Sequence, residues 1–251
     1  MMSPMKNPMK KKDDLILVSV DDHVVEPPDV FEKHLPAKYQ EFAPKLKERD
    51  DGTLAWYYYE HEITNVGLNA VAGRPREEYG IEPTRLDEMR KGCWDVDERI
   101  KDMNAGGLLG SLCFPSMPGF SGRIFASAKD NDIAGAMVKA YNDWHVYEWC
   151  GKHPGRFIPL GVPMIWSADE TAKEVHRLAD MGCHAISFPE NPGIDGKHNE
   201  PSTPAAFMSR TRSSTSQQPL RISSRRVGSI PYSSRGRPAT ALRPTFVISC
   251  S

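Results

Sequence analysis

Residues 15–23 read LILVSVDDH, an apolar run that ends in two acidic residues and a histidine. The length and β-branched content of this run predict a buried β-strand. Because strand side chains alternate between two faces, Asp21 and His23 should project to one side and Asp22 to the other. A carboxylate and an imidazole at the carboxyl end of a strand can supply two ligands to a divalent metal ion. An isolated triplet of this kind is more often an acidic turn with a partly exposed histidine, so the metal interpretation depends on the rest of the sequence.

Length and composition limit the class of protein. The chain has 251 residues and 39% hydrophobic content, which suffices for one barrel-sized domain or two small ones. No apolar stretch approaches the roughly 20 residues of a membrane span, and the apolar run after the N-terminal lysines is too short for a secretory signal. The five cysteines form no C-x-x-C pair, which is typical of reduced thiols. We therefore expect a cytoplasmic protein without a membrane partner.

The charge distribution divides the chain near residue 200. Residues 1–200 contain 33 acidic residues and 24 Lys and Arg, whereas residues 201–251 contain eight Arg and no Lys, Asp or Glu. A segment rich in Arg, Ser and Pro without an apolar period cannot offset its ordering entropy. The sequence therefore predicts a flexible N-terminus (1–13), a folded body (14–200) and a disordered tail (201–251). The abrupt change in composition is also typical of out-of-frame translation, so we expect a frameshift near this boundary.

Strands and helices are predicted to alternate along the body. Apolar runs indicate strands, apolar positions at helical spacing indicate helices, and an aromatic stretch indicates a hairpin. The expected strands are 14–20, 108–114, 156–162 and 184–188, the expected helices are 96–104, 129–150 and 168–181, and the hairpin is 53–64.

This order predicts right-handed strand–helix–strand units around a parallel sheet. The sequence contains neither G-x-G-x-x-G nor G-x-x-x-x-G-K, which argues against a nucleotide-binding fold. A complete (β/α)8 barrel needs about 250 residues, and only four units are found because about residues 30–92 form an insertion. The predicted fold is α/β, the N-terminal half of a TIM-type metal-dependent hydrolase barrel with an insertion after the first strand.

Several segments together resemble the amidohydrolase-related family that includes aminocarboxymuconate-semialdehyde decarboxylase and γ-resorcylate decarboxylase. The matching segments cover roughly residues 14–196 and are Val20-Asp21-Asp22-His23, Tyr141-Asn142-Asp143-Trp144, Pro154-Gly155-Arg156-Phe157-Ile158-Pro159-Leu160 and Met181-Gly182-Cys183-His184-Ala185-Ile186. The resemblance implies that Asp21 and His23 are metal ligands, with zinc the expected ion and manganese an alternative.

The same resemblance implies further ligands and a catalytic histidine on later strands. No His follows His198 and no Asp follows Asp195, so those positions are absent and the metal site is expected to be incomplete. The implied reaction is non-oxidative decarboxylation of a small aromatic or unsaturated acid, because an acid-x-His pair resembles the decarboxylase branch. Hydrolysis of a C–N or C–O bond is the alternative, and a non-catalytic fragment is a third. We expect no measurable turnover by this chain.

Other candidate residues come from loops, and no catalytic residue is assigned. Arg74 and Arg85 in the insertion could pair with a substrate carboxylate, although a solvated loop charge is the simpler explanation for each. Glu190 and Asn191 follow the strand predicted at 184–188, where substrate contacts and an ordinary solvated turn are equally expected. His145 is expected at the surface and His184 in the core.

The expected partner is a small carboxylic acid. Four strand–helix units would leave open sheet edges, so a homodimer is possible. The Arg-rich tail lacks regular repeats and has few aromatic residues for stacking, so nucleic-acid binding is not expected.

Overall fold

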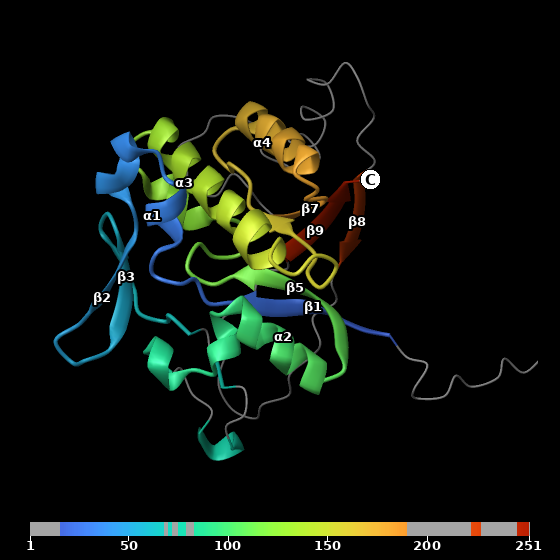
Figure 1. Ribbon diagram of the computed structural model, residues 1–251. Coiled ribbons are helices and arrows are strands. Elements are labelled where there is room, and N and C mark those ends of the chain that lie inside the picture. The colour runs from blue at the N-terminus through green and yellow to red at the C-terminus, as the bar shows by residue number, and fades with distance from the viewer. Residues whose placement is uncertain are drawn as a thin grey trace, which may run out of the picture.

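The computed structural model describes residues 16–67, 70–71, 75–78 and 83–189, and the backbone of two strands at 222–226 and 245–250 (Figure 1). The strands are β1 (Leu17–Val24), β2 (Lys45–Glu48), β3 (Leu54–Tyr58), β4 (His61–Ile63), β5 (Leu108–Pro115), β6 (Leu160–Gly161), β7 (Ala185–Pro189), β8 (Ile222–Arg226) and β9 (Thr245–Cys250). The α-helices are α1 (Val30–His34), α2 (Val96–Ala105), α3 (Asn131–Trp144) and α4 (Ala168–Asp180), and α3 continues into a π-helical turn, η7 (His145–Cys150). Short 3-10 turns are η2 (Ala37–Phe42), η3 (Arg76–Glu78), η4 (Leu86–Glu88), η5 (Lys91–Cys93) and η6 (Arg123–Ser127).

Four parallel strands form the centre of the fold. β1 pairs with β5, and β6 pairs with β7, in both cases in parallel. A parallel bridge between Ser111 and Phe157 joins the two pairs, with Ser111 N–H donating to Arg156 O at 3.0 Å. Since α2, α3 and α4 connect these strands in order, the predicted α/β class and its strand–helix units are confirmed.

A buried polar network ties α3 to the residue that follows Gly161 of β6 and to α4. The Asn142 amide donates to Val162 O at 3.0 Å and accepts from Val162 N at 2.9 Å. The same amide donates to Glu174 Oε1 at 2.8 Å, and Arg177 bonds both Glu174 and Asp143. These contacts give the Tyr141–Trp144 segment a structural role, since it fixes a helix against the neighbouring strand.

The segment between β1 and α2 carries its own small sheet. β2, β3 and β4 form an antiparallel meander, which confirms the predicted hairpin. Trp56 and Tyr58 on β3 are almost fully buried. The ring of Phe31 packs edge to face with that of Trp56, and the ring of Phe125 packs edge to face with that of Tyr58. The aromatic stretch therefore packs the meander onto the core.

Several predicted boundaries differ from the structure. β1 extends to Val24, so the Asp-x-His pair lies inside the strand and not in a turn after it. Only Leu160 and Gly161 of the strand predicted at 156–162 form a ladder, with β7. His145 is fully buried and His184 is exposed, so the expected locations of these two histidines were wrong.

Two strands lie within the segment predicted to be a disordered tail. β9 pairs antiparallel with β7 and with β8. The sequence Thr245-Phe246-Val247-Ile248 is β-branched and aromatic, which suits it to the edge of β7. This pairing differs from the expectation that nothing in the segment docks, while the rest of the tail lies outside the described residues.

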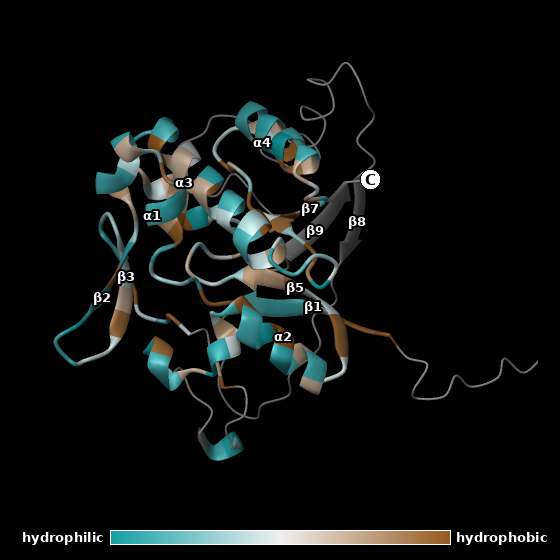
Figure 2. Cartoon of the chain, viewed as in Figure 1, coloured by the Kyte–Doolittle hydropathy of each residue, from teal (hydrophilic) through white to brown (hydrophobic). Residues whose placement is uncertain are grey.

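The first residues of β1 and the residue before it are apolar (Figure 2), and their side chains are exposed. Ile16, Leu17, Val18 and Val20 expose between 43% and 74% of their surface, and within the described residues β1 pairs only with β5. Open parallel edges with apolar side chains favour association.

No helix in the described part of the chain has both the length and the apolar character of a membrane span.

The start of α2 offers a local stability test. Asp95 caps the helix, with its carboxylate accepting from Asp97 N at 3.0 Å and Glu98 N at 3.1 Å. Asp95→Ala should lower the free energy of unfolding by about 1 kcal/mol, because two helix N–H groups lose their acceptor. Urea denaturation would measure the change. Asp87→Ala, at a surface ion pair with Arg85, should cost less than about 0.5 kcal/mol; equal losses would contradict the capping role.

Candidate metal site and relation to known proteins

His23 lies near the carboxyl end of β1 on an aromatic face of the sheet. Its ring centroid is 5.9 Å from that of Phe114 and 5.6 Å from that of Phe120. Phe114 belongs to a buried cluster with Leu112, Leu160 and Ala185, contributed by β5, β6 and β7. Alternate residues of the central strands therefore converge on one interior face, and His23 is on it.

The imidazole of His23 has an unused nitrogen. Nδ1 is buried and has no hydrogen-bond partner. Burial is the largest influence on the pKa of His23 and lowers it, while the carboxylates of Asp21 and then Asp22 act in the opposite direction. A buried nitrogen that is unpaired and neutral has a free lone pair, which is the form of histidine that binds metals.

The two aspartates beside His23 differ in their surroundings. Asp22 accepts from Ser19 Oγ at 2.7 Å and from Ser111 Oγ, and it lies opposite Cys113 in the β1–β5 ladder. Asp21 is exposed, and it has the larger electrostatic effect on the His23 pKa of the two. The carboxylate of Asp22 is thus engaged with two serines, whereas that of Asp21 is open to a ligand.

A bulge in β1 changes the simple alternation predicted from sequence. Ser19 lies opposite Ser111 and Asp22 lies opposite Cys113, so β1 has one more residue than β5 over this interval. The extra residue allows Ser19 and Asp22 to hydrogen-bond, although strict alternation would place them on opposite faces. The bulge interrupts the alternation on which the expected convergence of Asp21 and His23 rests, and that convergence stays a prediction.

Glu26, which sequence reasoning missed, is buried just beyond the end of β1. It has 0% exposure and accepts from Ser116 N and Met117 N, both at 2.9 Å. Burial raises its pKa to about 7, against the opposing effect of these hydrogen bonds. Ser116 Oγ also donates to Val24 O at 2.7 Å. Glu26 therefore joins the loops that follow β1 and β5. The only feature of the sequence that could have indicated this role is the position of an acidic residue just after a predicted strand.

Of the other predicted site residues, only Arg85 lies in the described part of the chain. Arg85 donates to Glu48 at 3.0 Å, to Gly52 O at 2.6 Å and to Asp87 at 3.2 Å, so its guanidinium is engaged at the surface. Arg74, Glu190 and Asn191 lie outside the described residues. A role for any of these four in substrate binding stays a prediction.

The described side chains do not form a complete metal site. Within the described ranges, no group of three or more His, Cys, Asp or Glu side chains is placed to hold a metal ion. Structural and catalytic zinc sites use three or four protein ligands. A metal site on Asp21 and His23 therefore stays a prediction.

Comparison with known proteins gives the family. The amidohydrolase family model matches residues 30–210, a span that begins just after the Asp-x-His pair. No curated protein matches the sequence.

Two solved structures resemble the fold. One is an amidohydrolase from Mycobacterium avium subsp. paratuberculosis, with 18% identity and a TM-score of 0.50 over 68% of this chain and 47% of that one. The other is a 5-carboxyvanillate decarboxylase from Novosphingobium aromaticivorans complexed with manganese and 4-hydroxy-3-methoxy-5-nitrobenzoic acid, with 18% identity and a TM-score of 0.40 over 67% of this chain and 39% of that one. The chain therefore spans about half the length of the first protein and less than half the length of the second. Since the family model covers most of its length, the chain belongs to the amidohydrolase family.

Proposed function

We propose that Asp21 and His23 supply two ligands to a divalent metal ion in a metal-dependent enzyme. The observation that carries this proposal is the buried Nδ1 of His23, which has no partner in the protein. An unpaired buried polar atom costs free energy, and a metal ion would relieve that cost. Zinc is the proposed ion because an imidazole and a carboxylate are among its usual ligands, and manganese is the alternative.

The proposed reaction is decarboxylation of a small aromatic or unsaturated carboxylic acid. It is supported by the acidic residue at position 21, since the resemblance that pairs an acid with His23 is to carboxy-lyases. Such an ion, when bound, supplies a Lewis acid. The protein's own contribution is orientation, because the rings of Phe114 and Phe120 hold the His23 imidazole and shield it from water.

Metal titration of the protein and three variants tests this site. We expect weak binding of Mn²⁺, measured by electron paramagnetic resonance of the free ion, and displacement of Mn²⁺ by Zn²⁺. His23→Ala and Asp21→Asn should each weaken Mn²⁺ binding by roughly tenfold or more, because each removes one of only two ligands.

Asp22→Asn is the matched control, because it removes a neighbouring charge whose carboxylate is engaged with Ser19 and Ser111. It should weaken Mn²⁺ binding by about twofold or less, since only a screened electrostatic contribution is lost. Equal losses in all three variants would mean that the acidic triplet attracts cations without a defined site, and the proposal would fail.

A further inference from the structure

One aromatic side chain beside His23 is exposed to solvent. The ring of Phe120 lies 5.6 Å from that of His23 and 5.4 Å from that of Phe114, in both cases nearly perpendicular to it. Phe114 is only 3% exposed, whereas Phe120 is 39% exposed. Edge-to-face contacts with two rings hold Phe120 in place, and the exposed part of its ring can still contact a ligand.

The loop that carries Phe120 crosses the carboxyl ends of three strands. It begins at Ser116, after β5, and Gly122 packs against Val162, just after β6, where an added Cβ would lie 3.2 Å from the valine Cβ. The carbonyl of Phe120 accepts from the hydroxyl of Ser187 on β7. In parallel α/β folds, ligands bind outside the carboxyl ends of the strands. Phe120 is therefore at the edge of the sheet where a ligand is expected.

Two consecutive tight turns shape this loop. Gly119 N–H donates to Ser116 O and Gly122 N–H donates to Gly119 O, both at 3.2 Å. The two glycines have φ of +70° and +67°, the left-handed region that favours glycine. Ser121 is buried, so the loop buries the residue next to Phe120 while it exposes Phe120 itself. An aromatic ring on an anchored loop loses little conformational entropy when a ligand packs against it.

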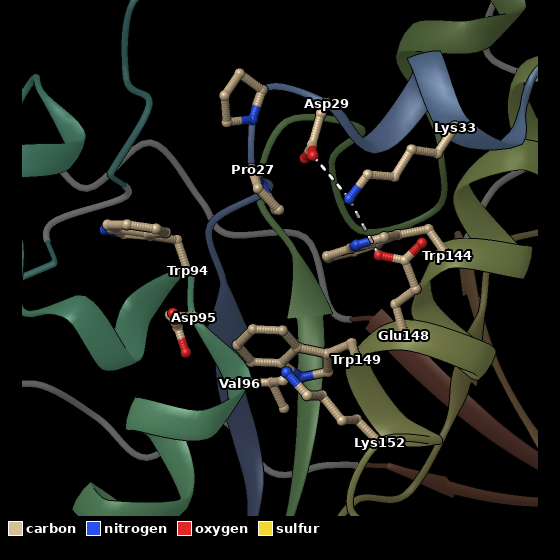
Figure 3. Close-up of a pocket in the computed structure, with 11 residues that line it drawn as sticks. Pro27, Asp29, Lys33, Trp94, Asp95, Val96, Trp144, Glu148, Trp149 and Lys152 are labelled. Carbon is tan, nitrogen blue, oxygen red and sulfur yellow. Dashed lines mark ion pairs between the residues drawn. The ribbon is translucent and has the colours of Figure 1, made fainter.

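The pocket beside η7 offers no comparable surface. It has a volume of about 380 Å³ and lies between the loop after β1, the start of α2 and η7 (Figure 3). Its carboxylates already have partners in the protein, as Glu148 has His34 at 2.8 Å and Asp29 has Lys33 at 2.7 Å. The Trp149 ring in its wall is almost fully buried. A ligand there would displace contacts that the protein already makes, whereas the exposed part of Phe120 requires no such loss.

We propose that Phe120 is a specificity-determining residue that makes the site prefer planar, aromatic acids over saturated ones. The ring of the acid packs against the exposed part of the Phe120 ring, and aromatic pairs contribute more than their buried area alone. The direction of the carboxylate rests on the proposed function, because an ion held by Asp21 and His23 would attract it. The packing of the two rings does not depend on the ion.

Two acids with the same charge and ring size test the proposal, benzoate and cyclohexanecarboxylate. Their dissociation constants are measured by ligand-observed NMR, without added ion and with Zn²⁺. We expect benzoate to bind roughly fivefold tighter under both conditions, because its ring pairs with an aromatic side chain. Burial of apolar area alone would favour the saturated ring, which has the larger apolar surface. Zn²⁺ should strengthen the binding of both acids by the same factor, since each carries one carboxylate.

Variants of Phe120 assign the preference to its ring. Phe120→Leu keeps an apolar side chain without a ring, so the two acids should bind about equally, whereas Phe120→Tyr should retain the preference for benzoate. The matched control is Tyr147→Leu, because Tyr147 is an aromatic residue of η7 with 58% exposure, and it should leave the preference unchanged. Nuclear Overhauser effects between benzoate and the Phe120 ring give a second measurement that needs no variant.

Failure of this proposal and failure of the metal site give different results. Equal affinities of the wild type for the two acids, or a benzoate preference that survives Phe120→Leu, would overturn the role of Phe120. Absence of saturable benzoate binding by the folded protein would overturn it as well. A benzoate preference that depends on Phe120 but does not respond to Zn²⁺ would support this proposal and count against the metal site instead.

Discussion

Arg177→Met is expected to lower the free energy of unfolding by roughly 3 kcal/mol, because it leaves the carboxylate of Glu174 without its cation. Glu174 has 0% side-chain exposure, and both its oxygens accept from Arg177, at 2.6 and 2.8 Å. It also accepts from the amide of Asn142, which in turn accepts from the backbone N–H of Val162, just after β6. Loss of Arg177 should therefore weaken the contact between α3 and α4 as well as the ion pair.

Urea denaturation of the single and double variants would measure this loss. Arg177→Met combined with Glu174→Gln should recover part of the stability, because no unpaired charge stays buried. Lys173→Met on the same helix removes an exposed partner of Glu170 and should cost less than about 0.5 kcal/mol. If Arg177→Met behaves like Lys173→Met, the network is not a source of stability.

The alternation of strands and helices could be predicted because it depends on local patterns. α4 shows this most clearly, since Ala172 and Leu178 lie on its apolar stripe and are both buried. Strand lengths were less predictable, because pairing depends on partners distant in sequence. The strand predicted at 156–162 pairs with β5 only around Ser111, and nothing within residues 156–162 indicates this.

The sequence could indicate which residues are candidates for the site, but it could not indicate how their side chains are arranged. The LILVSVDDH run identified Asp21 and His23, whereas the bulge opposite Ser111 and Cys113 depends on a partner strand about 90 residues later. His145, on the helix predicted at 129–150, was expected at the surface, but its ring stacks on Tyr141, with centroids 5.9 Å apart, inside the core. The burial of Glu26 likewise depends on Ser116 and Met117, with which it shares no sequence signal.

Glu26 connects the carboxyl ends of two strands through a group whose charge depends on pH. Its pKa is raised from 4.5 to about 7 by burial, and its acceptor bonds to Ser116 N and Met117 N hold the loop after β5. Burial, and after it the nearby charge of ionised Glu26, raise the pKa of the Tyr141 hydroxyl well above its ordinary value. Because burial outweighs the two hydrogen bonds in its effect on the Glu26 pKa, the fold favours the protonated form of Glu26.

The stability of the protein should therefore fall as pH rises from about 4.5 to about 7. Below pH 4.5 the carboxyl is protonated in both states, and between these values the unfolded chain releases the proton while the folded chain retains it. The loss should total about 3 kcal/mol and stop above pH 7. Glu26→Gln removes the titration, so the variant should gain about 3 kcal/mol relative to the wild type between pH 4 and pH 8. Urea denaturation of both proteins at several pH values would measure this difference. Other titrating groups, such as His145, contribute equally to the stability of both proteins, so their effects cancel in the difference. A difference that does not change with pH, or that changes in the opposite direction, would show that the two backbone N–H groups outweigh burial and keep Glu26 ionised.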